Sequence, residues 1–452
     1  MKVLKSVALA SLLSFTGFGQ HAFASSSLKK PILHDFDDDG VDGGLYRPSV
    51  AGPKSRIAVY IMHAEQDYTS FVACEALQER GFTVFCANND ASKSGYMSDL
   101  NFEDMMTNVN QGMTYLRNLT DIDKVVILGH SGGGAMMAAY QGIAENGASA
   151  CQGSEKIYPC SDEMDDLEPA DGLILLDANY GLSTMAFLSL SPAIIDESSP
   201  SKINETLNVF NPANGFNNNT RSNYTAEFKK AFQSGAVARN NRIIKHAQER
   251  LAAIEAGNGT YSDDEPFTVP ASLYIGFNNL FFAQDTRYLA HTTHAWPLLH
   301  KNGTTTQVVR SVRVPANFKS FADQWEGGAL KSTVKRYLST FAIRVGDDYN
   351  LRADGIDGID YASSNLAPVA SIRGVSVPLL TMGMTGHYEY LNAEKLHLAA
   401  GSNDTTIAFV EGAQHTIDTC TACESFPGEF GNTVVTCFNH VENWLAKKGR
   451  FI

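Results

Sequence analysis

Apolar residues in the first half of the chain gather in short runs that alternate with amphipathic segments. The runs predict buried strands at 45–47, 57–62, 82–85, 125–128 and 172–176. The segments between them include 70–80 and 102–116, whose apolar residues recur at helical spacing. Near-continuous apolar strands that alternate with helices are typical of a parallel sheet covered by helices on both faces. The pattern therefore predicts the α/β class.

The pattern breaks between residues 182 and 374. This region holds an asparagine-rich stretch at 214–219 and a charged, helix-like segment at 224–256. No linker rich in proline, glycine or serine marks its two ends. We therefore expect 182–374 to be a lid or cap insertion within one domain, rather than a separate domain. Strand and helix patterns return at 375–382, 406–410 and 434–447.

The N-terminus has the pattern of a secretory signal peptide. Lys2 and Lys5 precede an apolar stretch at 7–18, and Ala22-Phe23-Ala24 supplies small residues for a cleavage site. We expect residues 1–24 to be removed and residues 25–452 to be exported, either to a periplasm or out of the cell. The apolar stretch is too short to cross a bilayer, and no later segment is apolar enough, so no transmembrane segment is expected.

The charge balance excludes one class of partner. The chain carries 35 Lys and Arg residues against 49 Asp and Glu residues, a formal net charge of −14. An acidic protein repels phosphate backbones and anionic membranes. We therefore expect no nucleic-acid partner.

The cysteines of an exported protein are expected to form disulfides. Their spacing suggests Cys74 with Cys86, Cys151 with Cys160, and Cys437 with either Cys420 or Cys423. A zinc site built from Cys420, Cys423, Cys437 and His440 is the alternative for the last group. Export favours oxidation, so we prefer the disulfides.

A glycine-rich pentapeptide, Gly129-His130-Ser131-Gly132-Gly133, lies between the strand at 125–128 and a helix-like run at 134–140. A serine on a sharp turn between strand and helix is the context of the G-x-S-x-G nucleophile motif. Glycines on both sides let the strand and the helix pass closely. The motif predicts that Ser131 is a nucleophile; the alternative is a tight glycine turn without chemistry.

A serine nucleophile needs a general base. His415 is the candidate because it follows the last predicted strand, at 406–410. Two other histidines, His387 and His440, lack that position at a strand end. The alternative for His415 is a loop histidine that only caps a turn.

The base in turn needs a carboxylate that orients it. Asp177 directly ends the strand at 172–176, and Glu389 lies a few residues past the strand at 375–382. We prefer Asp177 as the acid and keep Glu389 as the alternative, with Asp418 third. An aspartate in this place can also simply cap the following turn.

These motifs resemble those of α/β-hydrolase-fold serine hydrolases, whose triad runs Ser, acid, His along the chain. The step Leu176-Asp177-Ala178 is similar to the acid step of pancreatic lipases and plasma-type platelet-activating-factor acetylhydrolases. The resemblance covers 45–181 and 375–447 and does not cover the insertion. It implies an α/β-hydrolase fold, with a mostly parallel sheet and a large lid, and chemistry without a cofactor.

The resemblance also implies an oxyanion site made of two main-chain N–H groups. One is that of Gly132, directly after the serine. Relatives carry His-Gly after the strand that corresponds to 57–62, and the next residue donates the second N–H. This chain has His63-Ala64-Glu65 there, which assigns the donor to Glu65.

One acidic segment has the beginning of a calcium-binding loop. Asp35, Asp37 and Asp39 are followed by Gly40, but Tyr46 stands where the loop would need a bidentate glutamate. We therefore favour a solvated acidic turn and expect no metal ion.

The function that these residues indicate is the hydrolysis of a carboxylic ester through an acyl-enzyme, on a small-molecule or lipid-like substrate. An amidase or peptidase with the same triad is the first alternative. A hydrolase-fold binding protein without catalysis is the second.

Overall fold

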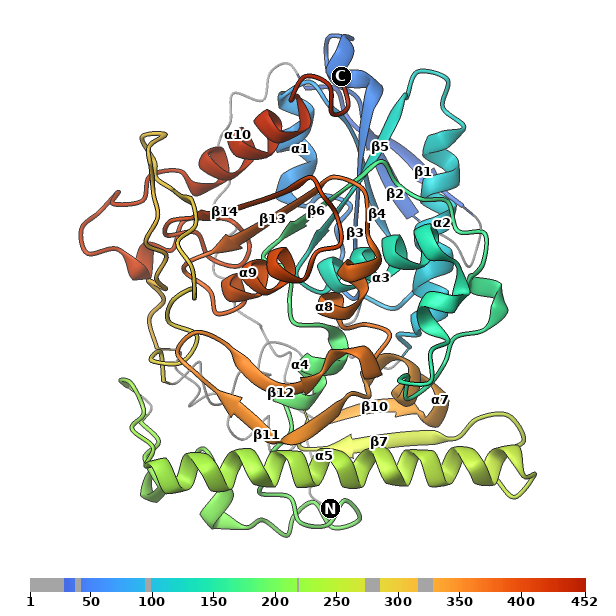
Figure 1. Ribbon diagram of the computed structural model, residues 1–452, viewed down its shortest axis with the longest axis vertical. Helices are drawn as coiled ribbons and strands as arrows, with labels where there is room; N and C mark the ends of the chain where they lie inside the picture. Colours follow the sequence, from blue (N-terminus) through green and yellow to red (C-terminus); the bar gives the residue numbers. More distant parts are fainter. Residues whose placement is uncertain (1–27, 37–41, 94–98, 218, 273–284, 316–327) are drawn as a thin grey trace, which may run out of the picture.

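The computed structural model describes residues 28–36, 42–93, 99–217, 219–272, 285–315 and 328–452 (Figure 1). The expected signal peptide, 1–24, and two of the calcium candidates, Asp37 and Asp39, lie outside the described residues. The third, Asp35, ends the first strand and pairs with Asp42. Within the described residues, no helix combines the length and the apolar character that a membrane crossing requires.

A ten-stranded sheet forms the centre of the molecule, in the order β1-β2-β4-β3-β5-β6-β13-β14-β8-β9. The strands from β4 to β8 run parallel, and the antiparallel pairs lie at the two edges. Their bounds are β1 Ile32–Asp35, β2 Asp42–Tyr46, β3 Ile57–His63, β4 Thr83–Asn88, β5 Lys124–His130, β6 Gly172–Leu176, β8 Leu298–Leu299, β9 Thr305–Thr306, β13 Leu379–Met384 and β14 Thr405–Val410.

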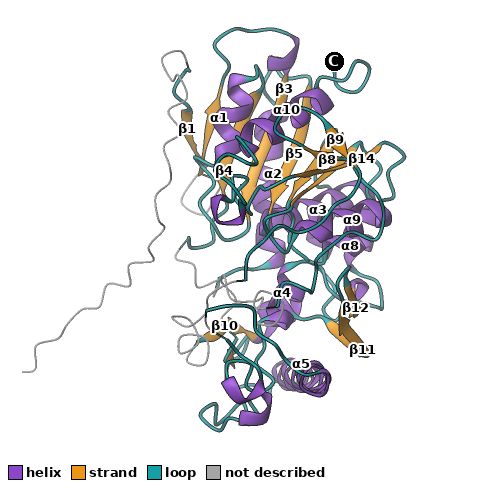
Figure 2. Ribbon diagram, turned by 90° about the vertical axis from the view of Figure 1, so that its left-hand side faces the viewer, coloured by secondary structure: helices purple, strands orange, loops and turns teal. Residues whose placement is uncertain are grey.

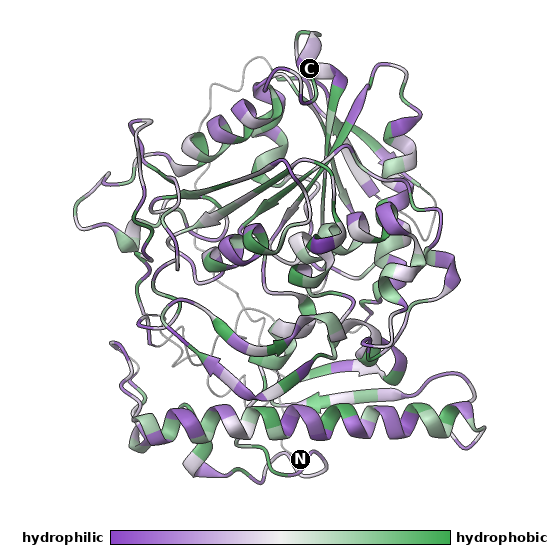
Figure 3. Cartoon of the chain, viewed as in Figure 1, coloured by the Kyte–Doolittle hydropathy of each residue, from purple (hydrophilic) through white to green (hydrophobic). Residues whose placement is uncertain are grey.

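Helices cover both faces of this sheet, as Figure 2 shows. On one face lie α1 (Val72–Glu79) and α10 (Thr433–Leu445); on the other lie α2 (Phe102–Arg117), α3 (Gly132–Asn146), α8 (Pro368–Ser371) and α9 (Tyr390–Ala399). Successive strand residues alternate between the two cores: Tyr60 faces α2 and α3, whereas Ile61 faces α1 and α10. The central strands β3, β5, β6 and β13 are buried between these two layers and are mostly apolar, as the colouring of Figure 3 shows.

The segment 182–374 supplies the lower part of the molecule in Figure 1. It contains α4 (Leu182–Leu188), the long helix α5 (Ala226–Glu255), the short α7 (Val334–Arg336) and two small sheets. The strands of these sheets are β7 Pro266–Pro270 with β10 Ala329–Thr333, and β11 Arg344–Leu351 with β12 Ile356–Asp360. The same segment also adds β8 and β9 to the edge of the central sheet beside β14.

A buried guanidinium fastens α5 to its surroundings. Arg239 is 1% exposed. It donates to both carboxylate oxygens of Glu197 and to the main-chain carbonyl of Ser191. It also donates to the main-chain carbonyl of Ala271. A buried charge needs such partners, so these bonds fasten α5 to the chain that precedes it and to the chain that follows it.

Two disulfides join Cys74 to Cys86 and Cys151 to Cys160, in the pairing that the spacing suggests. The expected pairing of Cys437 is wrong, because Cys420 is bonded to Cys423 and Cys437 is free and buried. Cys437 lies one turn before Val441 on the face of α10 that packs against the sheet. Cys437 is therefore packed into the core and does not reach the loop that holds Cys420 and Cys423.

Replacing Cys74 and Cys86 together with alanine is expected to lower the free energy of unfolding by about 3 kcal/mol. The bridge closes a loop of sequence separation 12 and so restricts the unfolded chain. Urea unfolding measures the loss. With a reductant present, the difference in the free energy of unfolding between wild type and this variant is expected to disappear. Any difference between wild type and the control Cys437→Ala should persist, because Cys437 forms no disulfide. A gap that survives reduction would show that lost packing, not the bridge, accounts for the effect.

Candidate active site

Ser131 lies on a strained turn between β5 and α3. Its φ and ψ angles are 55° and −126°, a combination that costs a non-glycine residue about 1–3 kcal/mol. The turn brings α3 close to the sheet: a Cβ on Gly133 would stand 2.5 Å from the carbonyl oxygen of Met62. Glycine is therefore required there, and the serine side chain is held at the carboxyl edge of the sheet.

Ser131, His415 and Asp177 form one hydrogen-bonded chain, although they are far apart in the sequence. Nε2 of His415 lies 2.7 Å from Oγ of Ser131, and Nδ1 of His415 lies 2.8 Å from Oδ2 of Asp177. Ser131 directly follows β5 and Asp177 directly follows β6, whereas His415 lies in the loop after β14. Because parallel strands end at one edge of a sheet, this is where such residues can converge.

Their contacts with His415 distinguish the three candidate acids, Asp177, Glu389 and Asp418. Asp177 is fully buried, and its second oxygen, Oδ1, accepts the N–H of Met384 at 2.9 Å. Oε2 of Glu389 lies 3.5 Å from Nδ1 of His415 and has no hydrogen-bond partner. Asp418 instead accepts hydrogen bonds from Gln414 and Thr416 and so shapes the loop that carries the histidine. Only Asp177 orients the imidazole by a hydrogen bond.

The charges of this cluster depend on one another. Burial alone would raise the pKa of Asp177, but hydrogen bonds from His387 and His415 hold that pKa well below its usual value. Burial would lower the pKa of His415, yet the neighbouring carboxylates of Glu389 and Asp177 raise it. Burial raises the pKa of Glu389. The site therefore favours a charged aspartate beside an imidazole of increased basicity.

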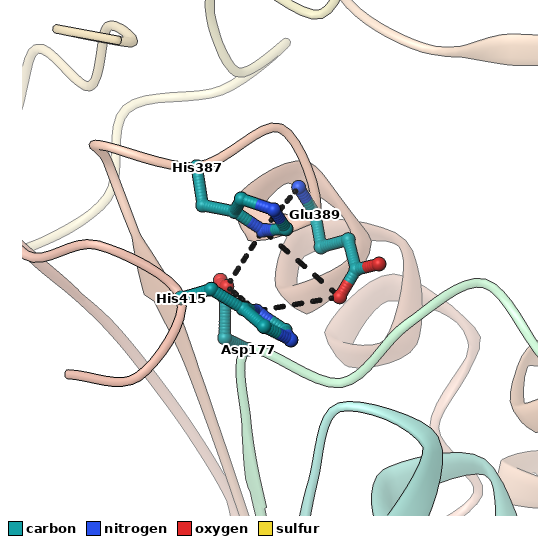
Figure 4. Close-up of side chains that lie close together, drawn as sticks. All are labelled: Asp177, His387, Glu389 and His415. Carbon is teal, nitrogen blue, oxygen red and sulfur yellow. Dashed lines mark hydrogen bonds and ion pairs between the residues drawn. The ribbon is translucent and has the colours of Figure 1, made fainter. Parts of the chain in front are cut away.

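His387 is a fourth member of the cluster that sequence reasoning set aside. Its Nδ1 lies 3.2 Å from the same Oδ2 of Asp177, and its ring centre lies 4.2 Å from that of His415 (Figure 4). The strand β13 extends to Met384, two residues beyond the predicted end, so His387 does follow a strand end. A strand boundary at 384 would have been the signal to find it.

His130, the variable residue of the pentapeptide, positions the backbone of His415. Its Nε2 lies 2.5 Å from the carbonyl oxygen of His415, and its Nδ1 lies 2.5 Å from the hydroxyl of Tyr68. Burial lowers the pKa of His130 to about 3, so the ring is neutral. A neutral imidazole carries a single N–H. Because the carbonyl of His415 can only accept a hydrogen bond, the proton of His130 lies on Nε2, and Nδ1 accepts the hydrogen bond of the Tyr68 hydroxyl.

Gly132 and Glu65, the two residues expected to form the oxyanion site, lie side by side. The side-chain carboxylate of Glu65, rather than its main-chain N–H, faces Gly132. A Cβ on Gly132 would stand 2.8 Å from Oε2 of Glu65. The main-chain N–H of Glu65 donates to Nδ1 of His63 at 3.2 Å. The Glu65 side chain is buried, Oε2 has no hydrogen-bond partner, and burial raises its pKa to about 7.

A separate hollow of about 410 Å³ lies between α5 and β11. Its walls include Lys229, Lys230, Asp347 and Asp348. Neither Ser131, His415, Asp177 nor any other member of their cluster lines this hollow, so it is separate from the candidate active site.

Comparisons with known proteins give remote similarities only. No protein-family profile matches the chain, and no curated protein sequence is similar to it. Among solved structures, siderophore hydrolase EstB from Aspergillus fumigatus has 11% identity and a TM-score of 0.42, covering 94% of this chain and 99% of its own. Monoglyceride lipase from Saccharomyces cerevisiae has 13% identity and a TM-score of 0.38, with 94% and 97% covered. Est1E from Butyrivibrio proteoclasticus has 10% identity and a TM-score of 0.37, with 92% and 98% covered.

The class of fold follows from the molecule itself. The largely parallel sheet, its helices on both faces and the strand–turn–helix elbow between β5 and α3 define an α/β-hydrolase fold. The chain order serine, aspartate, histidine agrees with that fold.

Replacing Glu65 with glutamine is expected to stabilise the protein by about 3 kcal/mol at pH 8 and much less at pH 5. The folded-state pKa of about 7 exceeds the ordinary value of 4.5. Between these two values the folded protein keeps a proton that the unfolded chain has lost. Stability therefore falls as pH rises through this window, and an uncharged glutamine avoids the loss. Urea unfolding at both pH values measures this difference, and Glu163→Gln, at an exposed position, is the control. An equal effect at pH 5 and pH 8 would contradict the buried charge.

Proposed function

We propose that this protein is a serine hydrolase that cleaves carboxylic esters through an acyl-enzyme. The observation that carries the proposal is the pair of distances around His415, 2.7 Å to Oγ of Ser131 and 2.8 Å to Oδ2 of Asp177. A serine hydroxyl becomes a nucleophile only when a base within hydrogen-bond reach takes its proton and a third group orients that base. The distances from His415 to Ser131 and to Asp177 support both conditions.

In the first step, Oγ of Ser131 attacks the ester carbonyl carbon while its proton passes to Nε2 of His415. The charge of Asp177 stabilises the imidazolium. The carbon–oxygen bond of the ester then breaks, and the imidazolium gives its proton to the leaving alcohol. In the second step, a water molecule loses a proton to His415, attacks the acyl-serine and releases the acid, which regenerates Ser131.

The oxyanion of the tetrahedral intermediate is assigned to the N–H of Gly132. This residue is the first of α3, so its N–H has no partner within the helix and carries the positive end of the helix dipole. The second donor remains the N–H of Glu65, which must turn from the ring of His63 toward the substrate. Each such donor contributes about 3–4 kcal/mol to the transition state.

The proposed setting is an oxidising compartment outside the cytoplasm. Three disulfides in one chain are typical of exported proteins, and they agree with the interpretation of residues 1–24 as a signal peptide. The substrate class is a small-molecule or lipid-like ester. The alternative reaction, amide cleavage by the same residues, is tested by comparing turnover of an aryl ester and the matching anilide.

Ser131→Ala is expected to lower kcat by about six orders of magnitude, because no other group replaces the nucleophile. Hydrolysis of an aryl ester measures this loss, and a fluorophosphonate probe should label the wild type at Ser131 but not the variant. The thermal unfolding temperature should stay close to that of the wild type. Labelling that persists in the variant would rule out Ser131 as the nucleophile.

The two buried carboxylates are expected to differ in their effect on kcat. Asp177→Asn should lower kcat by about 10⁴-fold, because an amide does not hold the tautomer of His415 that the base role requires. Glu389→Gln is the matched control, because Glu389 is also buried beside His415 but makes no hydrogen bond to it. If Glu389→Gln is the more damaging change, the acid role belongs to Glu389.

A further inference from the structure

Four side chains around Asp177 bring one potential metal-ligand atom each to within 4.8 Å of one another. The atoms are Oδ2 of Asp177, Nδ1 of His387, Oε2 of Glu389 and Nδ1 of His415. Asp177 directly follows β6, and the other three lie in the segments that follow β13 and β14; all four side chains point toward a common centre in Figure 4. Two imidazoles and two carboxylates form a ligand set that suits zinc.

The separations between these atoms are near those of a tetrahedral site. From Oδ2 of Asp177, Nδ1 of His415 lies 2.8 Å away and Nδ1 of His387 lies 3.2 Å away. From Oε2 of Glu389, the same nitrogens lie 3.5 Å and 4.0 Å away. Zinc bonds of about 2.0–2.2 Å to nitrogen and oxygen place tetrahedral ligand atoms roughly 3.3–3.5 Å apart. Shifts of a few tenths of an ångström complete the geometry.

Two of the four groups exceed what the proposed triad needs. Serine catalysis uses one imidazole and one carboxylate, so His387 and Glu389 are additional. The Glu389 side chain is 4% exposed, and its Oε2 has no hydrogen-bond partner. A buried acceptor without a partner is unfavourable, and a cation between the two carboxylates would supply one.

We propose that a divalent transition-metal ion, with zinc preferred, binds Asp177, His387, Glu389 and His415 and reversibly inhibits this protein. The inhibition rests on the proposed function of Ser131 and His415. In the active tautomer, Nδ1 of His415 carries the proton and Nε2 holds the lone pair that accepts from Ser131. Metal binding uses the lone pair of Nδ1, so the ring proton moves to Nε2. The nitrogen that faced the serine as an acceptor is then a donor, and the base is lost.

The ligand set decides which ions bind and what they do. Nitrogen ligands favour zinc and copper over magnesium and calcium, which prefer oxygen. Four protein ligands close a tetrahedral site and leave no position for a reactive water, so the ion blocks the serine reaction and does not replace it. The side chains of His387 and His415 are 22% and 27% exposed, so the ion enters from the imidazole side.

The decisive experiment measures binding separately from turnover. Zinc is titrated into metal-free Ser131→Ala protein by calorimetry, and cobalt is followed by its absorption bands as a tetrahedral probe. We expect one site per chain, and we expect zinc to inhibit ester hydrolysis by the wild type over the same concentration range. Magnesium and calcium should have no effect.

Variants identify the ligands. His387→Gln and Glu389→Gln should each weaken zinc binding at least about tenfold, as loss of a zinc-site group does. His246→Gln, an exposed histidine of α5, is the matched control and should leave the affinity unchanged. Undiminished binding in both cluster variants, or no binding at all, overturns the site whether or not the protein hydrolyses esters. Binding through His387 that leaves turnover unaffected overturns the inhibition.

Discussion

The carboxylate of Asp177 is the group on which the geometry of the site depends. It has no exposure to solvent, so its charge must be balanced within the protein. One oxygen is fixed by the main chain of β13 through the N–H of Met384, and the other faces both His387 and His415. Asp177 has a φ of 43°, a strained conformation for an aspartate. The strain is maintained because the main chain of Asp177 also bonds Met382. The imidazole orientation thus follows from how β6 and β13 pair.

The supports of His415 come from both sides of its loop. His130 holds its carbonyl from the β5 side, while the bridge between Ala413 and Thr419 and the disulfide of Cys420 close the loop behind it. Ser131 and His130 are neighbours, so one turn presents the hydroxyl of Ser131 and also fixes the backbone of His415. A turn that does both explains why the energetic cost of the positive φ at Ser131 is tolerated.

The sequence was sufficient for the parts of this site that follow from strong local patterns. The apolar runs located β3, β5 and β6 to within about two residues, and the pentapeptide located the elbow, because buried parallel strands and glycine turns leave clear signals. The strands β8 and β9 have two residues each and carry no periodicity, so they were missed. Cys437 was misassigned because helical packing, rather than proximity in sequence, decides which cysteines meet. His387 was set aside because the predicted strand stopped at 382, two residues before β13 ends, and because its contact with Asp177 joins segments far apart in the sequence.

The same nitrogen of His415 takes part in the proposed catalysis and in the proposed metal site, so the two uses exclude each other. The hydrogen bond to Asp177 is 2.8 Å long, whereas a zinc ion between the two atoms would need them about half an ångström further apart. Asp177 resists that movement because Met384 holds its other oxygen, and His415 resists it because His130 holds its carbonyl. The contacts that hold His415 in place therefore oppose the movement that the proposed metal site needs. The proposed ion has to displace the hydrogen bond between His415 and Asp177. This competition weakens its binding, so we expect it to act as a reversible inhibitor rather than as a permanent structural ion.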